Sequence, residues 1–224
     1  MKLLRYAVLA ATLIPAYSAP KDSDKRLDAA ADVMSEIMGT PDKSIPQDLL
    51  NKSECVIVVP GLKKGAFIVG GKYGRGFVTC RKESGVGWSA PGAVRVEGGS
   101  FGFQIGGAET DVVMLIMNKG GVKKLLTSKF TLGADASVAA GPLGRDTSAQ
   151  TDAMMNAEIL TWSRQRGVFA GIALTGATLR EDSDTNKDLY GQAYANKDLV
   201  AGTVEPPKTA TRLLGLLNKF SSRK

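Results

Sequence analysis

The first clear periodicity in the chain is helical and lies between residues 25 and 38. Apolar positions recur there every three or four residues, which places them on one face of a helix. These positions are Leu27, Ala30, Ala31, Met34, Ile37 and Met38. Asp24 can cap the start of this helix and Gly39 can end it. A second, short helix is expected to begin at Pro46, because proline is tolerated in a first helical turn.

From Cys55 to about Leu179 the pattern changes to short apolar runs separated by glycine-rich turns, which is typical of β-strands. The expected strands are 66–70, 76–81, 93–97, 100–105, 112–117, 134–139, 157–163 and 168–175, besides the run that opens at Cys55. Gly106-Gly107 and Arg166-Gly167 are expected hairpin turns. Short helices are expected at 122–126 and at 183–190, the second capped by Ser183 and ended by Gly191.

The chain holds 26 glycines, and many fall inside strand-like runs. Glycine within a strand marks a bulge, a sharp bend or a close approach of another backbone. The pattern therefore predicts an α+β fold. Its centre is a glycine-rich, strongly bent antiparallel β-sheet or barrel, with N-terminal and C-terminal helices packed around it.

The first 18 residues have the layout of a secretory signal peptide. Lys2 and Arg5 precede an apolar stretch, and small residues follow up to Ala19. Cleavage is expected after Ser18, and the other reading is a retained anchor, although the apolar run is short for a membrane span. We therefore expect an exported protein, periplasmic or extracellular, that is at most peripherally associated with a membrane.

Composition narrows the chemistry of the chain. It has 224 residues and no histidine, so serine or cysteine nucleophiles activated by imidazole and histidine-ligated metals are excluded. Two cysteines are too few for a thiolate metal site. Carboxylate-only hydrolysis needs no histidine, but no pair of acidic residues is spaced for it. We expect no enzyme activity, no metal and no cofactor.

The two cysteines, Cys55 and Cys80, are predicted to lie in an oxidising compartment, where a disulfide is permitted. If residues 66–70 form a strand between them, the cysteines lie on non-adjacent strands, about 9–10 Å apart. A disulfide needs Cα atoms within about 7 Å. Two buried free thiols are therefore favoured over a bridge.

The net charge is +7 and falls to +5 without residues 1–18, since that segment holds two basic and no acidic side chains. Lys63 and Lys64 follow the strand that ends near Pro60, and Lys72 and Arg75 lie in the next glycine-rich run. If these strands are adjacent, the four cations can gather at one end of the sheet and bind phosphate-bearing headgroups. The other reading is a set of solvated basic turns.

The C-terminal segment follows the linker Pro206-Pro207 and contains no acidic residue. Helical spacing places its leucines on one face and Lys208, Arg212 and Lys219 on the other. This form is typical of an interfacial helix that inserts its leucines into an anionic membrane. It is equally typical of a terminal helix that packs its leucines onto the domain.

Several glycine-rich motifs, taken in order, resemble the SYLF domain family. They are 70–76 (GGKYGRG), 87–91 (GWSAP), 98–106 (GGSFGFQIG), 110–113 (TDVV), 130–142 (FTLGADASVAAGP), 157–160 (AEIL) and 167–171 (GVFAG). Eukaryotic members of that family bind phosphoinositide membranes and actin, often beside a Src-homology-3 module. The layout here resembles that of bacterial exported members with a single domain. Together with the residue patterns above, the resemblance gives the expected organisation: a signal peptide at 1–18, a SYLF-like domain at 19–203, and a linker with a basic helix at 204–224.

These observations favour a non-catalytic domain that binds anionic phospholipid or phosphoinositide-like surfaces of the cell envelope. Its expected lipid-binding residues are Lys63, Lys64, Lys72, Arg75, Lys208, Arg212 and Lys219. The competing hypothesis is a structural or protein-interaction module of the envelope that uses the same basic and leucine-rich surfaces. Scattered aromatic residues argue against nucleic acid as the partner.

Overall fold

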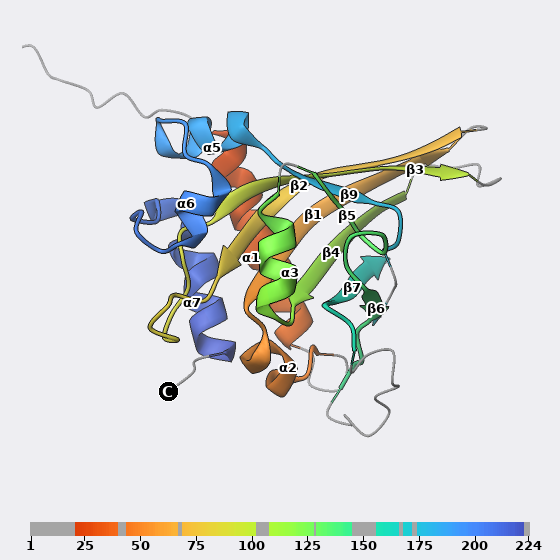
Figure 1. Cartoon of the computed structure of the whole chain (residues 1–224), viewed down its shortest axis with the longest axis horizontal. Helices are drawn as coiled ribbons and strands as arrows, with labels where there is room; N and C mark the ends of the chain where they lie inside the picture. Colours follow the sequence, from red (N-terminus) through yellow and green to blue (C-terminus); the bar gives the residue numbers. More distant parts are fainter. Residues whose placement is uncertain are drawn as a thin grey trace, which may run out of the picture.

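The computed structural model describes residues 21–39, 44–66, 69–101, 108–127, 129–144, 156–165, 168–171 and 174–221. Within them, nine strands form one sheet in the order β5-β9-β3-β2-β1-β4-β7-β6, with β8 paired to β7. All pairs are antiparallel except β6 with β7. The strands are β1 (Cys55–Ala66), β2 (Val69–Cys80), β3 (Gly92–Phe101), β4 (Ala108–Ile116), β5 (Phe130–Thr131), β6 (Val138–Ala140), β7 (Ile159–Gln165), β8 (Val168–Gly171) and β9 (Thr178–Glu181). The sheet is strongly curled, and the fold is α+β, as the sequence predicts (Figure 1).

The helices surround this sheet. They are α1 (Asp22–Gly39), α2 (Gln47–Lys52), α3 (Lys119–Leu125), α5 (Ser183–Tyr190), α6 (Asn196–Val200), the 3₁₀ turn η2 (Lys208–Ala210) and α7 (Thr211–Phe220). The long strands β1, β2 and β3 run together toward one end of the molecule, away from α7 and the C-terminus (Figure 1). That end carries four of the basic residues singled out in the sequence, which are Lys63, Lys64, Lys72 and Arg75.

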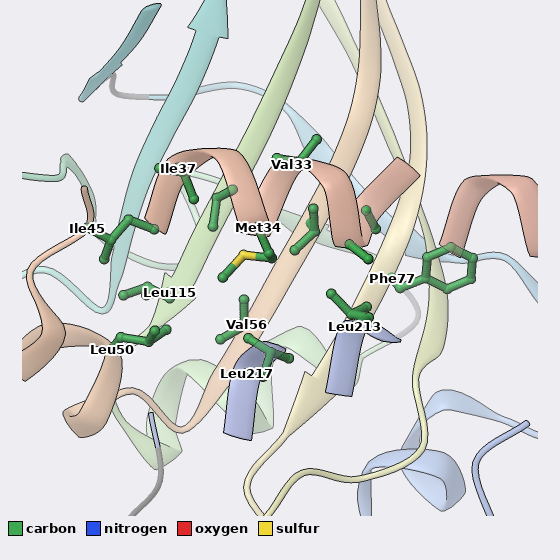
Figure 2. Packing of buried hydrophobic residues seen from close by; sticks show 14 of the residues in the cluster. Val33, Met34, Ile37, Ile45, Leu50, Val56, Phe77, Leu115, Leu213 and Leu217 are labelled. Carbon is green, nitrogen blue, oxygen red and sulfur yellow. The ribbon is translucent and has the colours of Figure 1, made fainter. Parts of the chain in front are cut away.

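One face of the sheet is covered by α1, α2 and α7, and is called the helix face below. Strand alternation turns every second side chain toward it, among them Val56, Phe77 and Leu115. The helices contribute Met34 and Leu217, among others, to the same fully buried cluster (Figure 2). The helical spacing predicted for 25–38 therefore reflects burial against the sheet.

The opposite face of the sheet, called the α3 face below, has a second core. Ile57, Val78 and Met114 point into it from the central strands. Leu125 of α3 and Phe130 of β5 close over them. Some of the strand glycines are needed because the curled sheet brings neighbouring strands close together. At Gly76 a Cβ atom would lie 2.1 Å from the carbonyl oxygen of Val58 on the neighbouring strand.

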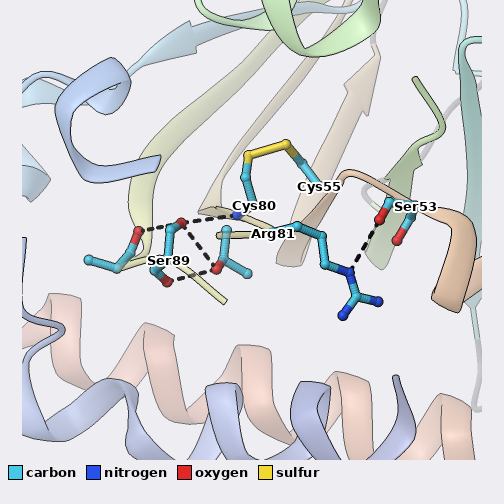
Figure 3. The surroundings of a disulfide bond; sticks show 7 residues. Ser53, Cys55, Cys80, Arg81 and Ser89 are labelled. Atoms are coloured by element: carbon cyan, nitrogen blue, oxygen red, sulfur yellow. Dashed lines mark hydrogen bonds between the residues drawn. A yellow bond between two sulfur atoms is a disulfide. The ribbon is translucent and has the colours of Figure 1, made fainter. Parts of the chain in front are cut away.

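The cysteines form a disulfide, so the expectation of two free thiols is wrong. Cys55 and Cys80 are directly opposite in the β1–β2 ladder, and their Cα atoms are 3.9 Å apart (Figure 3). The separate strand predicted at 66–70 does not lie between them. Instead β1 continues to Ala66 and β2 begins at Val69, so the two cysteine-bearing strands are neighbours.

Other local predictions differ by small shifts. Asp182, and not Ser183, caps α5, since its carboxylate accepts from the N–H of Thr185. Gly191 ends that helix in the left-handed conformation, as predicted. The strand predicted at 134–139 is reduced to β6. The signal peptide, both predicted hairpin turns and most of the strand predicted at 100–105 lie outside the described residues.

In the part of the chain that the structure describes, no helix is both long and apolar enough to cross a bilayer.

Candidate functional site

The four cations predicted for headgroup binding on the first two strands lie at the same end of the β1–β2 hairpin. Lys63 is opposite Tyr73 in the ladder, and Lys64 is opposite Lys72. Arg75 follows Tyr73 by two residues, so it lies on the same face of β2. Adjacency of β1 and β2, which the hypothesis required, is therefore met.

Strand geometry divides these cations between the two faces of the sheet. Residues directly opposite each other in an antiparallel pair point to the same face, and successive residues point to opposite faces. Lys64 and Lys72 consequently lie on the α3 face. Lys63 lies on the helix face with Tyr73 and Arg75. The hairpin end is thus basic on both sides.

Lys64 and Lys72 form a like-charge pair. Burial of its side chain lowers the pKa of Lys64, and the charge of Lys72 lowers it further. Like charges directly opposite in a ladder destabilise a sheet. No carboxylate among the described residues makes an ion pair within 4 Å of either ammonium group. An anion bound between them would relieve the repulsion.

On the helix face, a groove of about 410 Å³ runs between α1 and the hairpin end. Its lining consists of Arg26, Pro60, Gly61, Lys63, Tyr73, Gly74 and Arg75. Arg26 comes from α1, and neither it nor Lys63 has an ion pair within the described residues. Tyr73 is 45% exposed, an unusual position for a large aromatic side chain. The groove therefore offers cations on two walls and an aromatic ring between them.

A bulge in β1 shapes the floor of this groove. The ladder register shifts between Val59 and Leu62, and Gly61 adopts a left-handed conformation with φ of +61°. Its N–H donates to Asp111 at 2.9 Å, and Arg164 donates to the other oxygen of that carboxylate at 2.7 Å. Arg164 also pairs with Glu36 of α1. This network fixes the helix, the bulge and β4 relative to one another.

Arg75 is held by neighbouring side chains. Its Nε donates to the hydroxyl of Tyr73 at 2.7 Å and lies 3.2 Å from the buried carboxylate of Asp182. The hydrogen bond to Tyr73 is the largest influence on the guanidinium and raises the pKa of Arg75. Of the four predicted residues, Arg75 is the least available to an external anion, and it orients Tyr73 instead.

The C-terminal helix packs onto the domain. Leu213 and Leu217 are buried in the core against α1 (Figure 2), and Leu214 is buried in the same cluster. These leucines are therefore not exposed for insertion into a membrane. The alternative prediction, a terminal helix that packs its leucines onto the domain, is confirmed. Arg212 pairs with Asp32 of α1 at 2.5 Å. Lys208 and Lys219 are exposed.

Two lining residues of the groove were missed from the sequence. Tyr73 had a visible signal, since it is flanked by Lys72 and followed by Gly74 and Arg75 in one run. Arg26 had none, because only the packing of α1 against the bulge brings it there.

Among the described residues no group of three or more cysteine or acidic side chains is arranged to hold a metal ion. The hydroxyl of Ser89 has a structural role, since Ser89 is fully buried and its Oγ accepts a hydrogen bond from the N–H of Cys80 (Figure 3).

Comparison with known proteins relates the chain to a family of binding domains. The family model Ysc84, described as "Las17-binding protein actin regulator", matches residues 97–220. The chain is 35% identical over 184 residues to SH3 domain-containing YSC84-like protein 1 of Rattus norvegicus, covering 82% of this chain and 54% of that protein. It is 33% identical over 181 residues to LAS seventeen-binding protein 3 of Saccharomyces cerevisiae, covering 79% of this chain and 39% of that protein. The chain thus spans about half the length, or less, of these curated relatives.

Proposed function

Because the chain belongs to the SYLF (Ysc84) family, whose members are binding domains, we propose that it binds anionic phospholipid surfaces without catalysis. The contact is made by the basic end of the β1–β2 hairpin, through Lys63, Lys64 and Lys72. Arg26 and Tyr73 in the adjacent groove assist by receiving a headgroup.

The observation that carries this proposal is the Lys64–Lys72 pair. Two lysines are held opposite each other, and burial of Lys64 adds to the cost of its charge. Neither has a carboxylate partner within 4 Å among the described residues. A folded protein gains nothing from such a pair unless an anion neutralises it. A phosphodiester headgroup supplies that charge and accepts hydrogen bonds from both ammonium groups.

Cations on both faces suit a hairpin that meets a membrane end-on. A flat surface would need its charges on one face, whereas a projecting hairpin end is surrounded by headgroups on both sides. Each lysine near an anionic surface contributes about 1 kcal/mol, and the attraction weakens with salt. Three lysines are therefore enough for reversible, peripheral binding.

We place this activity in the cell envelope or outside the cell. The predicted signal peptide at 1–18 and the Cys55–Cys80 disulfide both support this proposal, since disulfides persist in oxidising compartments.

The test is co-sedimentation of residues 19–224 with phosphatidylcholine vesicles and with phosphatidylcholine–phosphatidylglycerol vesicles, at low and high salt. We expect binding to the anionic vesicles only, and loss of about tenfold or more in K64Q/K72Q. The matched control is K208Q/K219Q, which removes two exposed lysines from the C-terminal region and is expected to bind nearly as well as the unchanged chain.

Equal binding by K64Q/K72Q and the unchanged chain would refute the hairpin as the lipid contact. A loss confined to K208Q/K219Q would move the contact to the C-terminal segment. Truncation at Pro206 is not informative, because it removes three leucines of the core.

A protein partner is the second candidate, favoured by the name of the family model, which describes Las17 binding. Under this hypothesis the groove between α1 and the hairpin end receives a peptide, and Tyr73 packs against it. Binding to a protein that persists without lipid and at high salt, and that is lost in Tyr73→Ala, would favour this candidate over the first.

A further inference from the structure

Three arginines from distant parts of the sequence lie in one row across neighbouring strands of the sheet. Arg75 of β2 is directly opposite Arg95 of β3, and Arg95 is directly opposite Arg180 of β9. All three side chains point to the helix face, since they alternate with strand residues of the α3 face. Like charges opposite each other destabilise a sheet, and here the cost arises twice in one row.

The row is only partly neutralised. Arg75 is satisfied by Asp182 and Tyr73, as described above. Arg95 and Arg180 share the carboxylate of Glu97, at 3.8 Å and 3.6 Å respectively. These separations exceed those of hydrogen bonds. The Nε of Arg95 is buried and has no hydrogen-bond partner within the described residues. A buried N–H donor on a charged group can donate a strong hydrogen bond to an anion.

Arg95 and Arg180 line a cavity of about 410 Å³ at the edge of the sheet. Its remaining lining is Leu126, Thr127, Glu181, Ser183, Ala195 and Lys197. Lys197 adds a third cation, which is exposed. Glu181 offsets one of the three positive charges, and its oxygens already accept from the hydroxyl of Ser183 at 3.1 Å and from the N–H of Asn196 at 2.7 Å. The cavity therefore has an excess of positive charge and unused donors.

We infer that this cavity is a second anion site, which binds a phosphate monoester through Arg95, Arg180 and Lys197. Two guanidinium groups and one ammonium match the charge and the acceptor oxygens of a dianion, and guanidinium groups bind phosphate with paired N–H donors. The cavity is larger than a phosphate group, and Leu126 and Ala195 offer apolar surface to an organic substituent. The phosphate is thus expected on a small organic body.

This site is separate from the hairpin end. The lining of the cavity shares no residue with the groove at the hairpin end, and Lys64 and Lys72 lie on the α3 face of the sheet. The inference does not depend on lipid binding, and either can fail while the other stands.

The test is calorimetric titration of residues 19–224 with inorganic phosphate and with glycerol 3-phosphate. We expect one saturable site, with glycerol 3-phosphate binding more tightly than phosphate. R180Q and K197Q are each expected to weaken binding about tenfold, the effect of one charged contact. The matched control is K187Q, an exposed lysine of α5 that does not line the cavity, and it should bind like the unchanged chain. K197Q changes only an exposed side chain, so it tests the site without endangering the fold.

Binding to vesicles distinguishes the two possible sources of the phosphate, a soluble compound and a lipid headgroup. If the ligand is soluble, R180Q binds phosphatidic acid vesicles as the unchanged chain does, and K64Q/K72Q retains glycerol 3-phosphate binding. If the phosphate monoester belongs to a lipid, R180Q also loses binding to phosphatidic acid vesicles but keeps binding to phosphatidylglycerol vesicles. Absence of saturable binding to either soluble probe and to phosphatidic acid, or equal loss in K187Q, would overturn the inference.

Discussion

Lys64 is the residue at which stability and the proposed function oppose each other. Its pKa is lowered in the folded chain by burial and by Lys72, so the folded state pays for its charge at neutral pH. Function requires that charge, because an anionic headgroup is bound only by the protonated amine. Strain of this kind at a single position is common at binding sites.

We predict that Lys64→Met stabilises the chain by about 0.5 kcal/mol at pH 7, the size of one cross-strand pair. In the unchanged chain the penalty is complete below the folded-state pKa of Lys64. It disappears as pH rises toward 10.5, the ordinary pKa that applies to the unfolded state, because the folded form loses its proton first. The advantage of the variant should therefore shrink between pH 7 and pH 10.

Urea unfolding followed by tryptophan fluorescence at several pH values measures this difference. Lys63→Met is the matched control, since Lys63 faces Tyr73 and lies on the opposite side of the sheet. A stability gap for Lys64→Met that stays constant with pH would contradict the argument, and so would an equal gap for Lys63→Met.

At the level of elements, the β1–β2 hairpin is closed by the disulfide at the end opposite the basic residues. Cys55 is fully buried and Cys80 is 5% exposed, so the bond is protected from solvent. It joins positions 25 residues apart. The hairpin carries three of the proposed lipid contacts, so the disulfide also stabilises the element that presents them.

Replacement of both cysteines by alanine is predicted to lower the free energy of unfolding by about 3 kcal/mol, as expected for a loop of this length. The measurement is the urea midpoint of the double variant against that of the unchanged chain. Thiol alkylation without denaturant should label neither cysteine in the unchanged chain. Labelling under those conditions, or equal midpoints, would show that the bond is absent or does not contribute.

The C-terminal helix illustrates how one pattern serves two structures. An amphipathic helix with leucines on one face and cations on the other has the same sequence whether it packs on a membrane or on a protein. In this chain Leu213 and Leu217 find a complementary face on α1 and the sheet, and Arg212 finds Asp32. The helix is therefore part of the core.

At the level of the whole molecule, Arg81 joins segments that are distant in the chain. It is 8% exposed, and its guanidinium donates to the carbonyl oxygens of Leu50 at 3.1 Å and of Ser221 at 2.6 Å. It also lies 4.0 Å above the ring of Trp88. One side chain at the end of β2 thus holds two segments together, the end of α2 and the end of α7.

Arg81→Met is predicted to destabilise the chain by about 3 kcal/mol, because the buried carbonyl oxygens of Ser221 and Leu50 lose a charged donor and Leu50 keeps only hydroxyl donors. Arg81→Lys should recover only part of this loss, since an ammonium group cannot reach the same acceptors together. Urea unfolding measures both, and limited proteolysis should reveal earlier cleavage near the C-terminus. A loss below about 1 kcal/mol in Arg81→Met would show that the segments are held by the apolar core alone.

The sequence by itself determined most of the helices, although not α6, as well as the strand-rich centre, the glycine-dependent curl and the family. These depend on local periodicity and on residue types, which are visible in one stretch of chain: the spacing of Leu27, Met34 and Ile37 is sufficient for α1. Only the tertiary structure decided which strands are neighbours. That choice pairs Cys55 with Cys80, divides the hairpin lysines between two faces and aligns Arg95 with Arg180. Strand pairing depends on where the turns lie and on contacts between distant segments. A one-residue shift in the register of a strand moves its side chains to the other face of the sheet.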